Sequence, residues 1–290
     1  MNFFKALFSP ITAPITFIQN NFKATLFVAI IIYVLFNSNN TQLKTANLQE
    51  ISLNGTIMNV DSVLNEINKA KINKNIKGVL FKVNSGGGAV APSVEVAYAI
   101  KELNKLKPVI AYASGTMASG SYYASIWANK IIANPGSMIG SIGVIMQSAN
   151  ASELLSKIGI KPQTVKIGTY KEAGTPTRAW NKEEKDELTK VIKSTYDMFV
   201  FDVAKARNLK VSNHKIFADA HIFTSIQAKN VGLIDEVGTL SMAKNILQNE
   251  SNVTKAIWSK KDKMEIFFEK LVADTISQVS ILTDLKLMAK

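Results

Sequence analysis

Two segments of this chain combine serine and glycine in patterns that could support acyl transfer through a serine nucleophile. In residues 113–123, Ser119 lies between two small residues, Ala118 and Gly120. The apolar run 108–113 predicts a buried strand, and a helix is predicted to begin at Ala118. Ser119 is therefore expected where a strand passes into the N-terminus of a helix. Free N–H groups and the helix dipole can stabilise an oxyanion there. A tight glycine-serine turn without catalytic function is the alternative for this segment.

A glycine-rich segment follows the preceding predicted strand. That strand is predicted over 77–83, and it leads into Asn-Ser-Gly-Gly-Gly at 84–88. Glycines directly after a buried strand can adopt positive φ and let the backbone approach a ligand closely. A phosphate-binding loop is the main alternative, but the Gly-Lys-Ser/Thr ending of that motif is missing.

Composition excludes several other kinds of chemistry. The 290 residues contain no Cys, so disulfides, thiolate metal sites and a cysteine nucleophile are excluded. The two histidines, His214 and His221, form no zinc-binding motif, and we predict no metal and no cofactor. A Ser-His-Asp triad would have to recruit one of them, although structural roles are favoured for both. The net charge of +12 comes from scattered lysines, so nucleic acid is not predicted as a partner.

The N-terminal residues predict a membrane anchor. Residues 24–36 are apolar except for Thr25. As a helix they would span about 20 Å, short of the hydrocarbon core of about 30 Å, but Phe22 and a snorkelling Lys23 would extend the span. Because no small-x-small cleavage site follows, an uncleaved anchor is favoured over a signal peptide. The positive residues precede the span, which predicts that residues 1–23 stay in the cytoplasm.

Strands and helices are predicted to alternate, with the candidate segments at the carboxyl ends of strands, where open α/β sheets place their sites. Strands are predicted over 48–53, 77–83, 108–113, 130–133 and 163–167, with a further strand start in 140–144. Helices are predicted over 60–74, 91–106, 118–127, 182–208, 225–230 and 263–287. Asn181 and Glu184 are predicted to cap the long helix 182–208.

Five segments, in order, resemble the S49 peptidase family, the signal peptide peptidase A type of membrane-anchored serine protease. The family's Asn-Ser-Pro-Gly-Gly loop is similar to 84–88, and its Met-Ala-Ala-Ser-Gly-Gly-Tyr-Tyr turn is similar to 116–123. Its Gly-Ser-Ile-Gly-Val element stands at 140–144. Its Tyr-Lys-Asp/Glu loop with a Ser/Thr-Pro-x-Arg tail resembles 170–178, and its Gln-Ala-x-x-x-Gly-Leu-Ile-Asp run resembles 227–235.

The resemblance implies a Ser-Lys dyad. Ser119 would be the nucleophile and Lys171 its general base, with Ser141 hydrogen-bonded to the lysine amine. A lysine can act as a base near neutral pH only when its pKa is lowered. Burial among apolar groups lowers a lysine pKa, so Lys171 is expected in a closed, water-poor pocket.

The resemblance also implies an oxyanion hole formed by the N–H groups of Gly120 and Gly87, with Gly88 beside them. The departures from the family pattern replace no catalytic side chain: Gly86 stands for Pro, Met117 for Ala, Ser121 for Gly, and Ala220-His221 for Gly-Arg. Gly86 is expected to make the oxyanion loop more flexible than proline would.

By the same resemblance the fold is expected to be α/β, a crotonase/Clp-protease-like spiral of ββα units preceded by one transmembrane helix. The expected domains are a cytoplasmic segment 1–23, a signal-anchor 24–36, a peptidase domain 46–250 and a basic, amphipathic helical extension 251–290. A single set of motifs implies a short form that assembles into a homo-oligomeric ring or dome, an octamer among the candidates. Serine and lysine of one site would then come from adjacent subunits.

The expected function is a serine endopeptidase that hydrolyses short apolar peptides such as signal-peptide remnants. The expected location is the bacterial inner membrane, with the catalytic domain in the periplasm. Two alternatives remain open: a crotonase-fold acyl-CoA enzyme, and an inactive scaffold that binds peptides at the membrane. The predicted anchor and Lys171 argue against the first of these, because such enzymes are usually soluble and need no Ser-Lys pair.

Overall fold

The computed structural model describes residues 20–37 and 45–259, and the chain divides into two compact units, Met1–Thr45 and Ala46–Lys290. In the first unit, α2 (Phe22–Asn37) contains the segment predicted as an anchor. Among the helices described, none combines the length and the apolar character needed to cross a membrane. The transmembrane helix predicted over 24–36 therefore has no support from the structure. The helix predicted over 263–287 lies outside the described residues.

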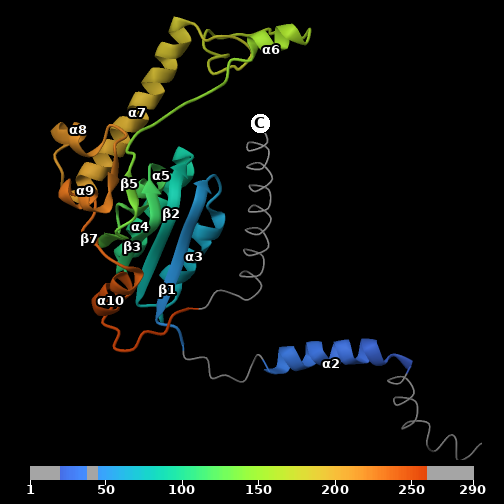
Figure 1. Cartoon of the computed structure of the whole chain (residues 1–290), viewed down its shortest axis with the longest axis vertical. Helices are drawn as coiled ribbons and strands as arrows, with labels where there is room; N and C mark the ends of the chain where they lie inside the picture. The colour runs from blue at the N-terminus through green and yellow to red at the C-terminus, as the bar shows by residue number, and fades with distance from the viewer. Residues whose placement is uncertain (1–19, 38–44, 260–290) are drawn as a thin grey trace, which may run out of the picture. The chain divides into compact units, whose positions relative to one another are not determined.

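The second unit is built on a seven-stranded sheet that is parallel along its main path (Figure 1). Along this path the order is β1 (Leu48–Ile57), β2 (Gly78–Gly88), β3 (Val109–Ala118), β4 (Lys130–Ala133) and β7 (Glu236–Val237). The last residues of β3 pair in parallel with β5 (Met138–Gly140), which pairs antiparallel with β6 (Ile222–Thr224). β3 thus contacts β4 with its first half and β5 with its second.

Helices follow the strands, so the predicted alternation of strand and helix is confirmed for β1 to α5. The helices of this unit are α3 (Asp61–Ile72), α4 (Val90–Asn104), α5 (Gly120–Ser125), α6 (Ser152–Lys157), α7 (Lys182–Arg207), α8 (His214–Phe217), α9 (Ser225–Asn230) and α10 (Leu240–Glu250), with a 3₁₀ turn η1 (Val211–Asn213). The capping box predicted for α7 is present: Asn181 Oδ1 accepts from the Glu184 N–H, and the Glu184 carboxylate accepts from the Asn181 N–H.

The sheet buries both of its faces, because successive side chains of a strand point in opposite directions. In β2, Val79 and Phe81 belong to a large core that also contains side chains of α3, α4 and α5. Leu80, between them, packs on the other face with Ala243 and Leu247 of α10. Strands buried on both faces explain the continuous apolar runs in the sequence.

Three neighbouring strands, β1, β2 and β3, are longer than predicted. β1 continues to Ile57 through a register shift between Asn54 and Thr56, where Gly55 has φ +70°. β2 includes the glycines at 86–88, which were predicted as a loop. A glycine lacks a side chain but keeps its backbone N–H and C=O, so the ladder with β1 continues to the pair Ile57–Gly88.

Residues 145–180, here called the arm, connect β5 to α7. In Figure 1 the arm carries α6 and lies beside the N-terminal part of α7, away from the sheet. The strand predicted over 163–167 is wrong for this chain: these residues form no ladder in the described structure. A strand needs a neighbouring strand to pair its backbone N–H and C=O groups, so an apolar pattern in the sequence is not sufficient to form one. Val165 and Ile167 are almost fully exposed, at 102% and 96%.

Candidate active site

Ser119 occupies a strained turn between β3 and α5. Its backbone has φ 54° and ψ −127°, a conformation that non-glycine residues rarely adopt. Its N–H donates to the Gly140 carbonyl at 2.7 Å, and its own carbonyl accepts from the Tyr123 N–H at 3.0 Å. A sharp strand-to-helix turn of this kind presents a serine hydroxyl at the end of a sheet. The prediction that Ser119 lies where a strand passes into a helix is confirmed.

The end of β2 packs directly against this turn. Gly87 has φ +95°, and a Cβ added there would lie 2.7 Å from the Gly120 nitrogen and 2.8 Å from the Ser119 Cβ. As the first residue of α5, Gly120 has an N–H without an acceptor inside the helix. The Gly87 N–H, however, donates to Ser85 Oγ at 3.1 Å. Gly88 lines the pocket beside Ser119, so it is better placed than Gly87 to act with Gly120.

Ser121, a departure from the family pattern, has a structural role. Its buried Oγ donates to the Ser85 carbonyl at 2.6 Å and accepts from the Ala118 N–H at 2.9 Å. These two bonds connect the serine turn to the glycine-rich end of β2. Ser121 thereby holds in place a segment for which the Gly86 replacement predicts extra flexibility.

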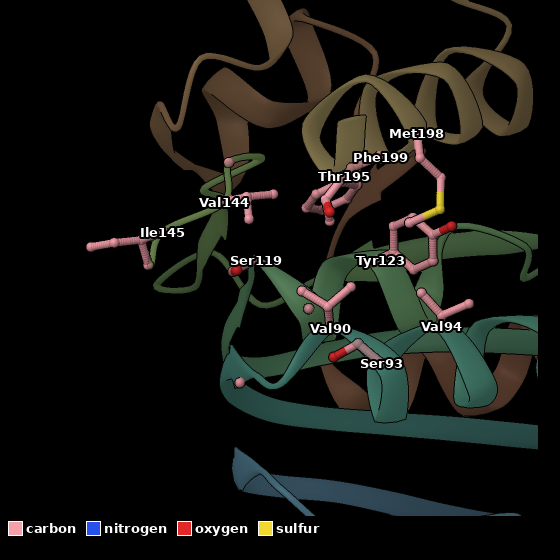
Figure 2. A pocket seen from close by; sticks show the side chains of 13 residues that line it. Val90, Ser93, Val94, Ser119, Tyr123, Val144, Ile145, Thr195, Met198 and Phe199 are labelled. Atoms are coloured by element: carbon pink, nitrogen blue, oxygen red, sulfur yellow. The ribbon is translucent and has the colours of Figure 1, made fainter. Parts of the chain in front are cut away.

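A largely apolar pocket opens beside Ser119 (Figure 2). It encloses about 500 Å³, open solvent at its mouth included. Its walls come from α4, the turn at Ser119, the residues after Ser141, and α7, and its side chains include Val90, Val94, Tyr123, Val144, Met198 and Phe199. In Figure 2 Val90, Val94, Met198 and Phe199 surround a space to one side of Ser119, whereas Ile145 points away from it. A pocket of this size and character suits an apolar side chain of a substrate.

The back of the pocket is held by a buried contact between α5 and α7. The Tyr123 hydroxyl donates to Asp202 Oδ2, and the Tyr123 ring packs edge-on against Phe199 with 4.8 Å between centroids. Burial, and then the hydrogen bond to Asp202, raise the pKa of Tyr123 far above its usual range. Tyr123 therefore stays neutral, and its hydroxyl remains a hydrogen-bond donor to Asp202.

Ser141 lies next to the serine turn. Gly140, which precedes it, pairs with Ala118 in the ladder between β3 and β5 and accepts from the Ser119 N–H. Ser141 itself has φ 50°, and its N–H donates to the His221 carbonyl at 2.7 Å. The His221 side chain is exposed.

Lys171 does not join these residues. It is exposed, and it lies in the arm near the N-terminus of α7. Arg178 joins Glu172, the neighbour of Lys171, to Glu184 near the N-terminus of α7. Glu184 is fifteen residues, or about 22 Å of helix, from Phe199 at the pocket, a distance that a lysine side chain cannot cover. Because Lys171 is exposed, the closed pocket expected around it is absent from the described chain.

Ion pairs fix the arm near Lys171 to α7. Arg178 contacts Glu184 at 2.6 Å and Glu172 at 3.0 Å, and Lys166 contacts Glu172 at 2.7 Å. Hydrogen bonds from Lys166 and then Arg178 lower the pKa of Glu172 to about 2. Hydrogen bonds from Arg178 and the Asn181 N–H lower the pKa of Glu184 to about 2. The arm is thus held as a defined structure rather than as a loose loop.

One wall of the pocket, formed by α7, has no clear signal in the sequence. Thr195 and Phe199 lie four residues apart on a helix face with apolar neighbours, which is the usual sign of a core position. Only the packing of α7 across α5 gives them contact with the pocket. Within residues 20–37 and 45–259, no cluster of His, Asp or Glu could hold a metal ion.

Several known proteins are similar to this chain in sequence. The family model of peptidase family S49 matches residues 101–254. A Methanocaldococcus jannaschii protein named as a putative protease is 42% identical over 191 residues, 66% of this chain and 61% of the relative. The "Putative signal peptide peptidase SppA" of Enterococcus faecium is 37% identical over 199 residues, 68% of this chain and 58% of the relative. "Serine protease SPPA, chloroplastic" of Arabidopsis thaliana is 31% identical, covering 70% of this chain and 30% of its own length.

The chain thus spans about three fifths of the length of the first two relatives. Among solved structures, a mutant of the 1510-N membrane-bound stomatin-specific protease aligns with a TM-score of 0.47 and 16% identity, over 74% of this chain and 88% of its own. A ClpP1 mutant from Listeria monocytogenes aligns with a TM-score of 0.45 and 15% identity, over 67% of this chain and 93% of its own.

Proposed function

Because the chain belongs to peptidase family S49, a family of serine proteases, we propose that it is a serine endopeptidase with Ser119 as nucleophile. The geometry of the Ser119 turn carries this proposal. The strained backbone presents the hydroxyl at the pocket, next to the free N–H of the first residue of α5. Attack of Ser119 Oγ on a peptide carbonyl would place the developing oxyanion between Gly120 and Gly88. The fold itself is proposed to be of the crotonase/Clp-protease kind.

The pocket supports short apolar peptides as substrates. Its lining of valine, methionine and aromatic side chains would remove an apolar side chain of the substrate from water, which stabilises the complex by about 1.5–3 kcal/mol for a residue such as leucine. Remnants of signal peptides are the proposed natural class, by analogy with the name of the E. faecium relative. Attachment to a membrane through α2 is part of the same proposal.

Lys171 is proposed to act as general base in the site of a neighbouring subunit. Two observations support this assignment. The ion pairs with Arg178 hold the arm away from its own serine, and Val165 and Ile167 of the arm expose their side chains fully. A second copy would cover these side chains and bring Lys171 to a second Ser119. The assembly would be a ring or dome, and an octamer is one such form.

A fluorophosphonate probe tests the nucleophile, because only an activated serine reacts with it. We expect labelling of the wild-type chain and complete loss of labelling and of peptide hydrolysis for Ser119→Ala. Ser148→Ala is the matched control, since Ser148 is an exposed serine of the arm outside the pocket. Unchanged hydrolysis by Ser119→Ala would end the assignment. An unlabelled wild-type chain would favour the acyl-CoA enzyme or the inactive scaffold.

Mixing two inactive variants tests the shared site. Chains with Ser119→Ala and chains with Lys171→Ala are each expected to be inactive alone. Co-expression should restore activity to about a quarter of wild type, because random association gives one interface in four both intact groups. No recovery in mixed assemblies would place serine and lysine in the same chain or remove Lys171 from the mechanism.

A further inference from the structure

Positively charged residues cluster where the parallel strands begin, at the opposite end of the strands from the candidate active site. Because β1, β2 and β3 are parallel, their first residues lie at one edge and the Ser119 turn lies at the other. We call the first edge the basic edge. It consists of the exposed residues Lys71, Ile72, Lys74, Lys77, Lys105, Leu106 and Lys255 and the half-buried Lys107.

Hydrogen bonds join these segments into one surface. Lys107 Nζ donates to the carbonyls of Ala70 and Asn73 at the end of α3, the latter at 2.6 Å. The Lys77 N–H donates to the Asn47 carbonyl at 2.7 Å, and Asn47 Nδ2 donates to the Lys255 carbonyl at 2.9 Å. The loops before β1, β2 and β3 and the residues after α10 are therefore fixed beside one another.

The positive charge of this surface is poorly compensated. Glu102 pairs with Lys105 at 2.6 Å. In the described structure no carboxylate forms an ion pair with Lys74, Lys77 or Lys107. Burial, and then the positive charge of Lys77, lower the pKa of Lys107.

Two large apolar side chains protrude between the lysines. Ile72 is 70% exposed and Leu106 is 62% exposed. Each has lysine as a neighbour in sequence, in Lys71-Ile72 and in Lys105-Leu106-Lys107. Protruding apolar groups flanked by lysines suit the boundary between headgroups and acyl chains of an anionic bilayer.

The chain enters the folded unit at this same edge. Ala46 and Asn47 lead into β1 here, and they follow the unit that contains the apolar helix α2. The segment Lys255–Ser259 runs beside them, with the Ser259 N–H donating to the Leu48 carbonyl at 2.8 Å. Beyond it the sequence adds Lys260, Lys261 and Lys263.

We propose that the basic edge docks on the surface of an anionic phospholipid membrane, with Leu106 and Ile72 entering the headgroup layer. The lysines contact lipid phosphates, and the parallel strands hold the active site on the far side. Ten residues of β3 separate the two edges by about 33 Å. This surface is independent of the peptidase chemistry, so peptide hydrolysis in detergent should be unchanged by alterations in it.

A single cysteine at Leu106 tests the docking directly, because the chain has no cysteine of its own. Full-length Leu106→Cys carries an environment-sensitive fluorophore and is mixed with vesicles of phosphatidylcholine and phosphatidylglycerol. We expect a blue shift and quenching by brominated lipid. Ile216→Cys on α8, where Ile216 is 60% exposed, is the matched control and should show neither. An unshifted spectrum at Leu106, or equal shifts at both positions, would overturn the proposal.

The lysines are tested by charge removal. Lys71→Gln, Lys74→Gln and Lys105→Gln together should weaken the preference of the full chain for anionic over pure phosphatidylcholine vesicles by roughly a hundredfold, at about tenfold or less per lysine. Lys205→Gln, Lys210→Gln and Lys215→Gln remove the same charge from exposed positions elsewhere and should leave the preference nearly intact. Equal losses of this preference in the two triple variants would mean that net charge, and not this surface, causes the binding. Loss of heparin binding with vesicle binding unchanged would assign the surface to another polyanion. Both results would overturn membrane docking.

Discussion

At the scale of single residues, two adjacent glycines have different structural requirements. Gly87 has φ +95°, and a Cβ there would overlap the Gly120 nitrogen and the Ser119 Cβ, whereas a Cβ at Gly86 meets nothing within 4 Å. The conformation of Ser119 therefore depends on the absence of a side chain at Gly87. Gly86, which replaces the proline of the family pattern, is free of this constraint.

We predict that Gly87→Ala lowers the free energy of unfolding by about 2–4 kcal/mol, from strain at positive φ and from the contact with the Ser119 turn. Peptide hydrolysis should fall at least tenfold. Gly86→Ala, the matched control, should be neutral or stabilise by up to about 1 kcal/mol, because it restricts the unfolded chain. Urea unfolding and hydrolysis of a peptide measure both effects. Equal behaviour of the two variants would contradict the packing of Gly87 against Ser119.

At the scale of elements, the contact between α5 and α7 positions the pocket wall. We predict that Asp202→Ala lowers the free energy of unfolding by about 1–3 kcal/mol, because it leaves the buried Tyr123 hydroxyl without an acceptor. Asp202→Asn keeps an acceptor oxygen and should lose less. With the wall loosened, KM for an apolar peptide should rise more than kcat falls. A loss of kcat alone would argue against a positioning role for this contact.

The attachment of the arm to α7 should depend on pH. The folded-state pKa values of Glu172 and Glu184, about 2 each, lie below the ordinary value of 4.5. Their contribution to stability is fully present above pH about 4.5 and is lost as pH falls through about 2. Trp180, whose Nε1 donates to the Thr175 carbonyl in the arm, should report the release as a change in fluorescence between these values.

Glu184→Gln is the control for this titration. Glutamine has no carboxylate to protonate, so the fluorescence change between pH about 4.5 and 2 should shrink. The arm should already be looser at neutral pH, because the charge that pairs with Arg178 is absent. If the variant and the wild type titrate alike, the ion pairs with Arg178 do not hold the arm.

At the scale of the whole molecule, the exposed side chains of the arm bear on assembly. We predict that Val165→Ser with Ile167→Ser reduces the size of the assembly and the activity together, because the arm loses the apolar area that a second copy would cover. Ile216→Ser, an exposed apolar residue of α8, should change neither. Mass measurement in solution together with peptide hydrolysis distinguishes the outcomes. Full activity in a monomer would contradict a shared site.

The sequence by itself determined the local structure around the nucleophile. The apolar run before Ser119 and the small residues after it predict a strand followed by a helix, and the structure contains both. The capping box of α7 depends on two residues three positions apart, so it could also be predicted from the sequence. α10 was missed, although Leu240, Ala243 and Leu247 have helical spacing and Thr239 caps its first turn by accepting from the Met242 N–H.

Only the tertiary structure decided which residues meet. The ladder between β3 and β5 places Gly140 at Ser119, and the packing of α7 on α5 turns Thr195, Met198 and Phe199 into a pocket wall. The motif around Lys171 predicts a catalytic role but not the distance between Lys171 and Ser119. The arm precedes the N-terminus of α7, and the length of α7 separates it from the serine. The basic edge was likewise hidden in scattered lysines. Parallel strands bring the loops before them to one edge, and this juxtaposition has no counterpart in the order of residues along the chain.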